Sequence, residues 1–116
     1  MHIQQLCSMS LSRCVGVTDA GVGLLAGLPH LSSLNLAHTC VLGRQLTSLR
    51  SLTHLDVGGC RGFSDAALHT LATSLQLLSS LALGGSGVSN TGLHVLQHLP
   101  GLCSLNLGHQ FEVRRQ

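Results

Sequence analysis

Histidine and cysteine are the residues of this chain best suited to chemistry, because imidazole and thiolate groups bind metals and serve in nucleophilic catalysis. The 116 residues include eight histidines and five cysteines. His94 and His98 lie four residues apart on an expected helix, and His69 stands in a similar segment earlier in the chain. A zinc site needs three or four ligands, and His-Val-Leu-Gln-His lacks the glutamate of H-E-x-x-H. We therefore expect no metal site and no other cofactor.

Nucleophilic catalysis is not indicated either. A catalytic triad needs an acidic residue to orient its histidine, and the only carboxylate side chains are Asp19, Asp56, Asp65 and Glu112. The chain contains no G-x-S-x-G, P-loop or dinucleotide-binding motif. Gly84-Gly-Ser-Gly87 has no lysine after it and is expected to be a turn. We expect a protein that is not an enzyme and that binds no small-molecule substrate.

The charge content excludes further classes of partner. Charged residues make up 9% of the chain and the net charge is +2, so there is no basic stripe for nucleic acid. No stretch has 18 consecutive apolar residues, and the first residues do not resemble a signal peptide. We expect neither nucleic-acid nor membrane binding. An odd number of scattered cysteines favours reduced thiols, and hence a cytoplasmic or nuclear location.

The spacing Leu-x-x-Leu-x-Leu organises the chain. It begins at Leu31, Leu52, Leu78 and Leu102, with a weaker copy at Leu6, which gives periods of 25, 21, 26 and 24 residues. Alternate residues of a strand face opposite ways, so each copy is a short strand whose apolar face only stacked neighbours can bury. This predicts an α/β leucine-rich-repeat solenoid. We expect a short horseshoe arc, with parallel strands on its concave face and helices or helical turns on its convex face.

The residues after each strand resemble the cysteine-containing class of leucine-rich repeat. Cys14 and Cys60 stand eight residues after their repeat starts, where a small buried thiol can satisfy backbone groups of the turn, and Thr39 and Ser86 replace them in two repeats. Three segments are similar to the class signature C-x-x-I-T-D-x-G-L: 17–22, 63–68 and 88–93. This class is common in F-box adaptor proteins. The resemblance therefore implies the substrate-recognition part of an SCF-type ubiquitin ligase.

The segments that return from one strand to the next should be helical. We expect three helices and one tight helical turn, over residues 19–27, 65–76, 90–98 and 43–49. Thr18, Ser64 and Ser89 stand at the expected N-caps, where a hydroxyl accepts a hydrogen bond from a free backbone N–H. The acidic or amide residue after each of them suits the positive end of a helix.

The candidate binding surface is formed by the side chains that face outward from the strands. These side chains are small and polar, and tryptophan and tyrosine, which commonly anchor interfaces, are absent from the chain. The best candidates for residues that bind a partner are the larger polar and charged ones, namely Arg13, Asn35, His38, His54, Asp56, Asn106 and His109.

We interpret residues 1–116 as a single leucine-rich-repeat domain without polar caps at its ends. Solenoids need such caps, so we expect the chain to be part of a longer repeat protein or to self-associate through its uncapped ends. The expected function is a protein–protein interaction module that binds a protein partner, not yet identified, on the concave strand face. Two alternatives stay open: a general scaffold or regulatory repeat segment, and a truncated fragment without autonomous activity.

Overall fold

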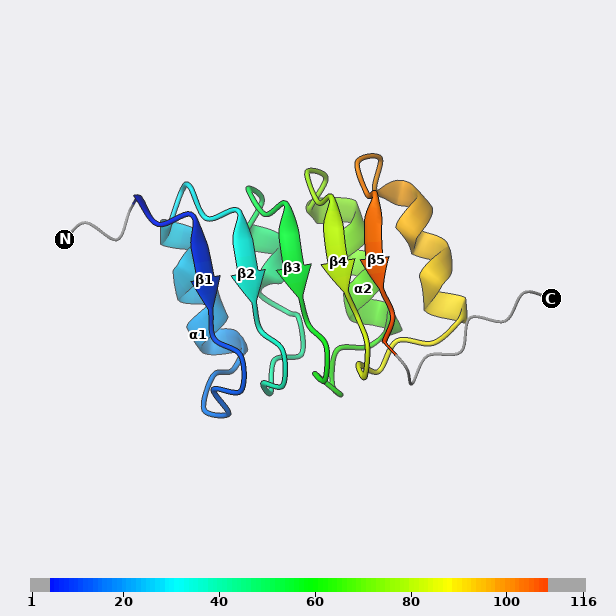
Figure 1. The fold of residues 1–116 in the computed structure, drawn as a ribbon, viewed down its shortest axis with the longest axis horizontal. Helices are drawn as coiled ribbons and strands as arrows, with labels where there is room; N and C mark the ends of the chain where they lie inside the picture. The colour runs from blue at the N-terminus through cyan, green and yellow to red at the C-terminus, as the bar shows by residue number, and fades with distance from the viewer. Residues whose placement is uncertain (1–4, 109–116) are drawn as a thin grey trace.

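The computed structural model describes residues 5–108, which form four strand-and-return units and a fifth strand, stacked side by side (Figure 1). The strands, three residues each, are β1 (Ser8–Ser10), β2 (Ser33–Asn35), β3 (His54–Asp56), β4 (Ser80–Ala82) and β5 (Ser104–Asn106). They form one parallel sheet in the order β1-β2-β3-β4-β5. Their pairing aligns the apolar residues that hold the same repeat position, namely Met9, Leu34, Leu55, Leu81 and Leu105.

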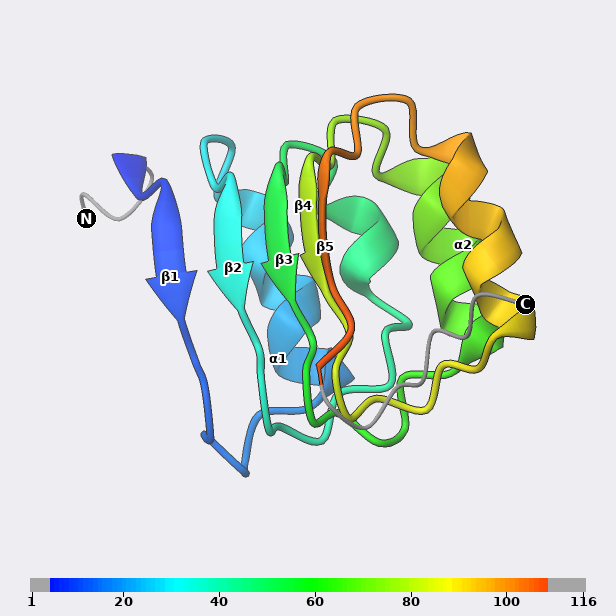
Figure 2. The same cartoon turned by 45° about the vertical axis from the view of Figure 1, so that its right-hand side comes forward.

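The return segments cover one face of this sheet and leave the other open (Figures 1 and 2). They are α1 (Asp19–Gly23), which continues as the 3₁₀ helix η2 (Leu24–Gly27), then η3 (Leu46–Ser48), α2 (Asp65–Ser74) and η4 (Thr91–His98). The helices are therefore confirmed within a few residues of their expected bounds, and η3 is the expected single turn. Within residues 5–108, no helix is long and apolar enough to cross a bilayer.

The core is the ladder of inward-facing strand residues packed against the return segments. Leu34, Leu55 and Leu81 are 1–3% exposed, whereas Leu105 on the last strand is 40% exposed. Phe63 is fully buried and compensates for the short return of the second repeat. A Cβ atom added at Gly43 would lie 2.8 Å from the Phe63 ring, so the glycine is what allows this large side chain to fill the space.

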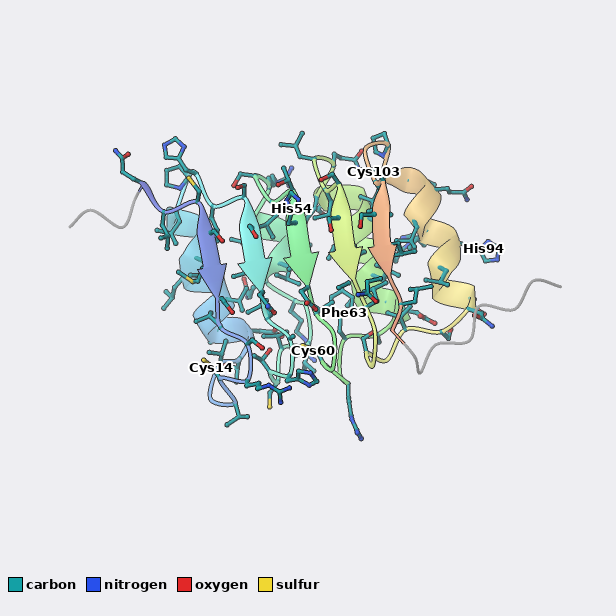
Figure 3. All side chains as sticks on the ribbon, viewed as in Figure 1. Cys14, His54, Cys60, Phe63, His94 and Cys103 are labelled. Atoms are coloured by element: carbon teal, nitrogen blue, oxygen red, sulfur yellow. The ribbon has the colours of Figure 1, made fainter. Side chains whose placement is uncertain are left out.

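The cysteine position works as expected in one repeat and not in another. The Cys60 thiol is fully buried and donates a 3.0 Å hydrogen bond to the carbonyl of Leu36, which also accepts from the Thr39 hydroxyl at 2.7 Å. Cys14, in contrast, is exposed (Figure 3). The expectation of a buried thiol there was wrong, because the equivalent carbonyl would belong to a strand before β1, and residues 5–108 contain none.

The expected N-caps were also wrong in their chemistry. Thr18 and Ser64 do precede helices, but neither side chain makes a capping hydrogen bond, and η4 begins after Asn90 rather than after Ser89. The carboxylates of the following aspartates bind backbone N–H groups of the next repeat instead. This link joins consecutive repeats, whereas an N-cap stabilises only its own helix.

Two such aspartate links occupy equivalent places. Asp19 accepts hydrogen bonds from the N–H groups of Leu42 and Gly43, at 3.0 and 3.1 Å. Asp65 accepts from the N–H of Ser89 at 2.8 Å and from the Ser89 hydroxyl. Leu42 and Ser89 both lie eleven residues after their repeat starts.

Candidate functional site

The open face of the sheet, which we call the strand face, carries the residues that alternate with the buried leucines. On β2 these are Ser33 and Asn35, which flank the buried Leu34, and on β3 they are His54 and Asp56. Both pairs are half-buried or exposed. The strand face is the surface on which the candidate residues were placed, and its chemistry depends on what happens where the strands end.

A side-chain cap closes four of the five strands. On β1 the Ser10 Oγ atom accepts a long hydrogen bond, 3.5 Å, from the backbone N–H of Ser12. The Oδ1 atoms of Asn35, Asp56 and Asn106 each accept a hydrogen bond from the backbone N–H two residues further on, at 2.8–2.9 Å. Asn and Asp favour such turns because their short side chains reach their own backbone. These candidates therefore have a structural role, in which only the Oδ1 atom is used. The second polar atom, Nδ2 of the asparagines and Oδ2 of Asp56, takes no part in the turn. Ala82, at the same position of β4, cannot make this bond.

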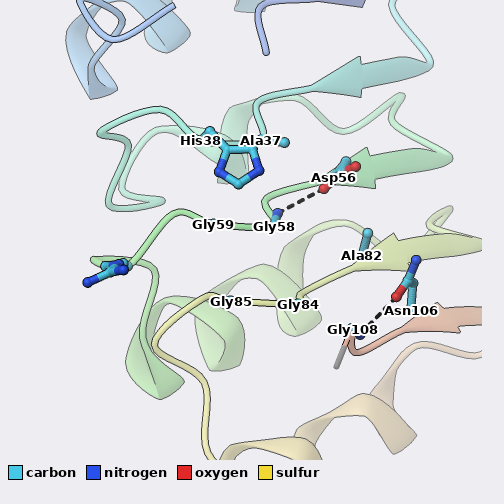
Figure 4. A pocket seen from close by; sticks show the side chains of 11 residues that line it. Ala37, His38, Asp56, Gly58, Gly59, Ala82, Gly84, Gly85, Asn106 and Gly108 are labelled. Atoms are coloured by element: carbon cyan, nitrogen blue, oxygen red, sulfur yellow. Dashed lines mark hydrogen bonds between the residues drawn. The ribbon is translucent and has the colours of Figure 1, made fainter. Parts of the chain in front are cut away.

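A second shared feature is a left-handed backbone shortly after the strand ends. Positive φ angles occur at Arg13 (66°), His38 (59°), Gly59 (75°) and Gly85 (80°), which hold equivalent positions in four repeats. Glycine adopts this conformation without cost, while arginine and histidine do not. The His38 ring lies over Gly59, where an added Cβ would overlap it (Figure 4).

These features surround a groove of about 420 Å³ at the carboxyl ends of β2 to β5. It is lined by Ala37, His38, Asp56, Gly58, Gly59, Arg61, Ala82, Gly84, Gly85, Asn106 and Gly108 (Figure 4). The floor is glycine backbone. The hollow exists because Ala82, between Asp56 and Asn106, has only a methyl side chain, which is too small to fill the space.

The structure brings three of the predicted residues together in this groove: His38, Asp56 and Asn106. Asn35 lies on the strand before and is not among the lining residues. Arg13 belongs to the first repeat and also lies outside the groove. His109 falls outside the described residues.

His54 lies at the amino end of β3, away from the groove at the opposite ends of the strands (Figure 3). Its Nδ1 atom is 2.8 Å from the Thr53 hydroxyl, and its side chain is exposed. His54 therefore lies on the strand face, like the groove residues, but it does not line the groove.

Sequence reasoning missed Arg61 and the glycine floor as parts of the site. The signal for the floor is present in the sequence as two adjacent glycine pairs, Gly58-Gly59 and Gly84-Gly85, in equivalent positions of consecutive repeats. A pair of residues without side chains, repeated in register, must leave a gap on a surface that is otherwise covered.

Among residues 5–108, Asp56 is the only one with a carboxylate that lines the groove. Its Oδ1 atom holds the Gly58 N–H, whereas no hydrogen bond or ion pair between described residues reaches Oδ2. Arg61 also lines the groove, but none of its nitrogens lies within 4.0 Å of the carboxylate. The groove therefore contains an acidic oxygen that the described part of the protein does not neutralise.

The histidines of the convex side form no comparable site. In a 3₁₀ helix, residues three apart are aligned and residues four apart diverge by about 120°, so His94 and His98 on η4 point to different sides. No group of three or more metal-binding side chains occurs in the described ranges. A hollow of about 320 Å³ lies beside the first turns of α2, with Leu42 and Arg44 on one side and Ala66 and Thr70 on the other.

No family model matches the chain. Among solved structures, an internalin from Listeria monocytogenes matches with a TM-score of 0.60 and 25% sequence identity, over 74% of this chain and 24% of the internalin chain. The chain thus spans about a quarter of the length of that protein. The internalin is a leucine-rich-repeat protein. The chain has five parallel strands in one open sheet, with helices on one face of it. Together with the likeness to the internalin, this arrangement confirms the fold as an α/β leucine-rich-repeat solenoid.

Proposed function

We propose that this chain is a protein–protein interaction module that binds a protein partner on its strand face. The observation that carries the proposal is the groove at the carboxyl ends of β2 to β5, where His38, Asp56 and Asn106 converge over a glycine floor. Stacked repeats create extended binding surfaces of this kind, and the leucine-rich-repeat fold of the internalin supports the same general role. The proposed activity is recognition rather than catalysis.

The test is a comparison of two arginine substitutions on opposite faces. Ala82→Arg places a long side chain in the middle of the groove, and His69→Arg places the same side chain on the exposed surface of α2. We expect both variants to fold, because both positions are solvent-accessible. Quantitative affinity enrichment with the wild-type chain and the two variants should yield partners that Ala82→Arg loses and His69→Arg retains. Equal retention by all three proteins would show that the strand face is not the binding surface.

A more specific proposal concerns the process that the recognition serves. The similarity of the cysteine and T-D-x-G-L positions to cysteine-containing repeats supports a substrate-recognition role in an SCF-type ubiquitin ligase, in the cytoplasm or nucleus. The buried Cys60 thiol, which satisfies a carbonyl of the preceding repeat, fits that repeat class. Co-purification of cullin-type ligase subunits with the full-length gene product tests this role. Partners recovered without any ligase subunit would favour the scaffold alternative.

A further inference from the structure

We infer that the groove receives an arginine side chain of the partner, with its guanidinium group on Asp56. This inference rests on the proposed function and specifies the chemistry that the strand face recognises. Asp56 is half-buried, and its Oδ1 atom is already committed to the Gly58 N–H at 2.8 Å. Its Oδ2 atom has no donor within the described ranges. A carboxylate oxygen in this position is best satisfied by a cationic donor.

The shape of the groove favours arginine over lysine. The floor is made of peptide groups at Gly58, Gly59, Gly84 and Gly85, and the His38 ring covers it only at Gly59. A guanidinium is planar, weakly hydrated and able to lie on such a flat surface while it donates to a carboxylate, whereas an ammonium is compact and strongly hydrated. The volume of about 420 Å³ is ample for the end of an arginine side chain.

The groove's own arginine does not take this place. Arg61 lines the hollow, but it makes no ion pair with Asp56. Its positive charge opposes that of an incoming guanidinium, so Arg61→Gln should strengthen the binding of a cationic probe. Asn106, at the other side of Ala82, uses Oδ1 for the Gly108 N–H and has an amide nitrogen left to donate. That nitrogen suits a carbonyl oxygen of the same partner segment.

The experiment is an NMR titration of the full chain with two small probes, N-acetyl-arginine amide and N-acetyl-citrulline amide. The two have nearly the same shape, but only the first is charged. We expect the arginine compound to shift the backbone amide signals of the four floor glycines and to bind about fivefold more tightly than the citrulline compound, as suits a partly exposed ion pair. The difference should shrink as salt is added.

Asp56→Asn provides a matched variant, because Asn35 and Asn106 already make the same turn hydrogen bond in this protein. It should fold normally and bind the two probes equally. Ala82→Asn, which gives β4 the longer side chain that β5 carries at Asn106, should weaken the binding of both probes. Equal binding of the two probes to the wild-type chain, no shift with either, or an arginine preference that survives Asp56→Asn would each overturn the inference.

The same measurements separate this inference from the proposed function. If Ala82→Arg releases protein partners while the two probes bind alike, the strand face is the binding surface and the arginine assignment is wrong. If Ala82→Arg releases nothing, the proposed function fails as well.

Discussion

Because of the link between Asp65 and Ser89, the effects of Asp65→Ala and Gly92→Ala on the free energy of unfolding should not be additive, although the two positions lie 27 residues apart. Asp65 binds the backbone N–H and the hydroxyl of Ser89 in the next repeat. A Cβ atom added at Gly92 would overlap the Asp65 carboxylate. The alanine at position 92 should therefore damage the protein mainly by displacing that carboxylate from Ser89.

The expected sizes follow from the contacts. Asp65→Ala removes two hydrogen bonds to a charged acceptor and an acidic group from the first turn of α2. Since Ser89 is exposed and its donors can turn to water, we expect a loss of about 2 kcal/mol rather than the larger value typical of buried groups. Gly92→Ala alone should cost a similar amount, about 2 kcal/mol, through overpacking.

In the Asp65→Ala background the carboxylate is gone, and the new Cβ lies 3.1 Å from the Cβ of residue 65. This contact needs a shift of only a few tenths of an ångström, and alanine is the better helix former. Gly92→Ala should then change the free energy of unfolding by less than about 0.5 kcal/mol, so the double variant is far better than the sum of the single ones. Urea denaturation followed by circular dichroism measures all four proteins. Additive losses would refute the link between these repeats.

Three further predictions concern stability. Leu81→Ala, in the ladder, should cost about 2–5 kcal/mol, whereas Asn35→Ala should cost about 1 kcal/mol, the value of one partly exposed hydrogen bond; equal losses in urea titrations would mean that the inner and outer faces are misassigned. Cys60→Ala should lower the melting temperature, because the buried Leu36 carbonyl loses one of its two side-chain donors and keeps only the Thr39 hydroxyl, while Cys14→Ala, at an exposed position, should leave it unchanged. His38→Gly should raise the free energy of unfolding, or leave it unchanged, by relief of a left-handed residue; a large loss would show that the contact of the ring with Gly59 outweighs the strain.

The fold could be predicted because the same leucines satisfy two patterns: they recur once in every repeat, and they alternate with polar residues along each strand. Leu34, Leu55 and Leu81 recur at a spacing that only a parallel stack can bury, and a shift of one residue would turn each of them to water. The short second repeat was also predictable, since a return of that length has room for one turn such as η3. The burial of Phe63 beneath Gly43 was not, because it depends on the packing between two repeats.

The site was only partly predictable. The alternation of the strands identifies Asp56 and Asn106 as outward-facing, but the hollow between them comes from the small side chain of Ala82 and from the glycine pairs, which have none. The direction of a side chain can be predicted from the strand pattern, whereas a hollow between side chains depends on how several repeats pack. Predicting Cys14 as buried failed for a related reason, because the carbonyl that binds such a thiol belongs to a neighbouring strand.

The aspartate links explain why aspartate and glycine occur together in the repeat signature although they act in different repeats. Asp65 needs a glycine one repeat later, at Gly92, because any side chain there would meet its carboxylate. Ala67 holds the glycine position of the third repeat, and it is tolerated because the second repeat has no aspartate to accommodate. The space is used instead by Phe63 and Ala67, which pack against Gly43. The residue at this position is therefore set by the preceding repeat, so exchanging single repeats between positions should lower the stability of the protein wherever an aspartate would meet an alanine.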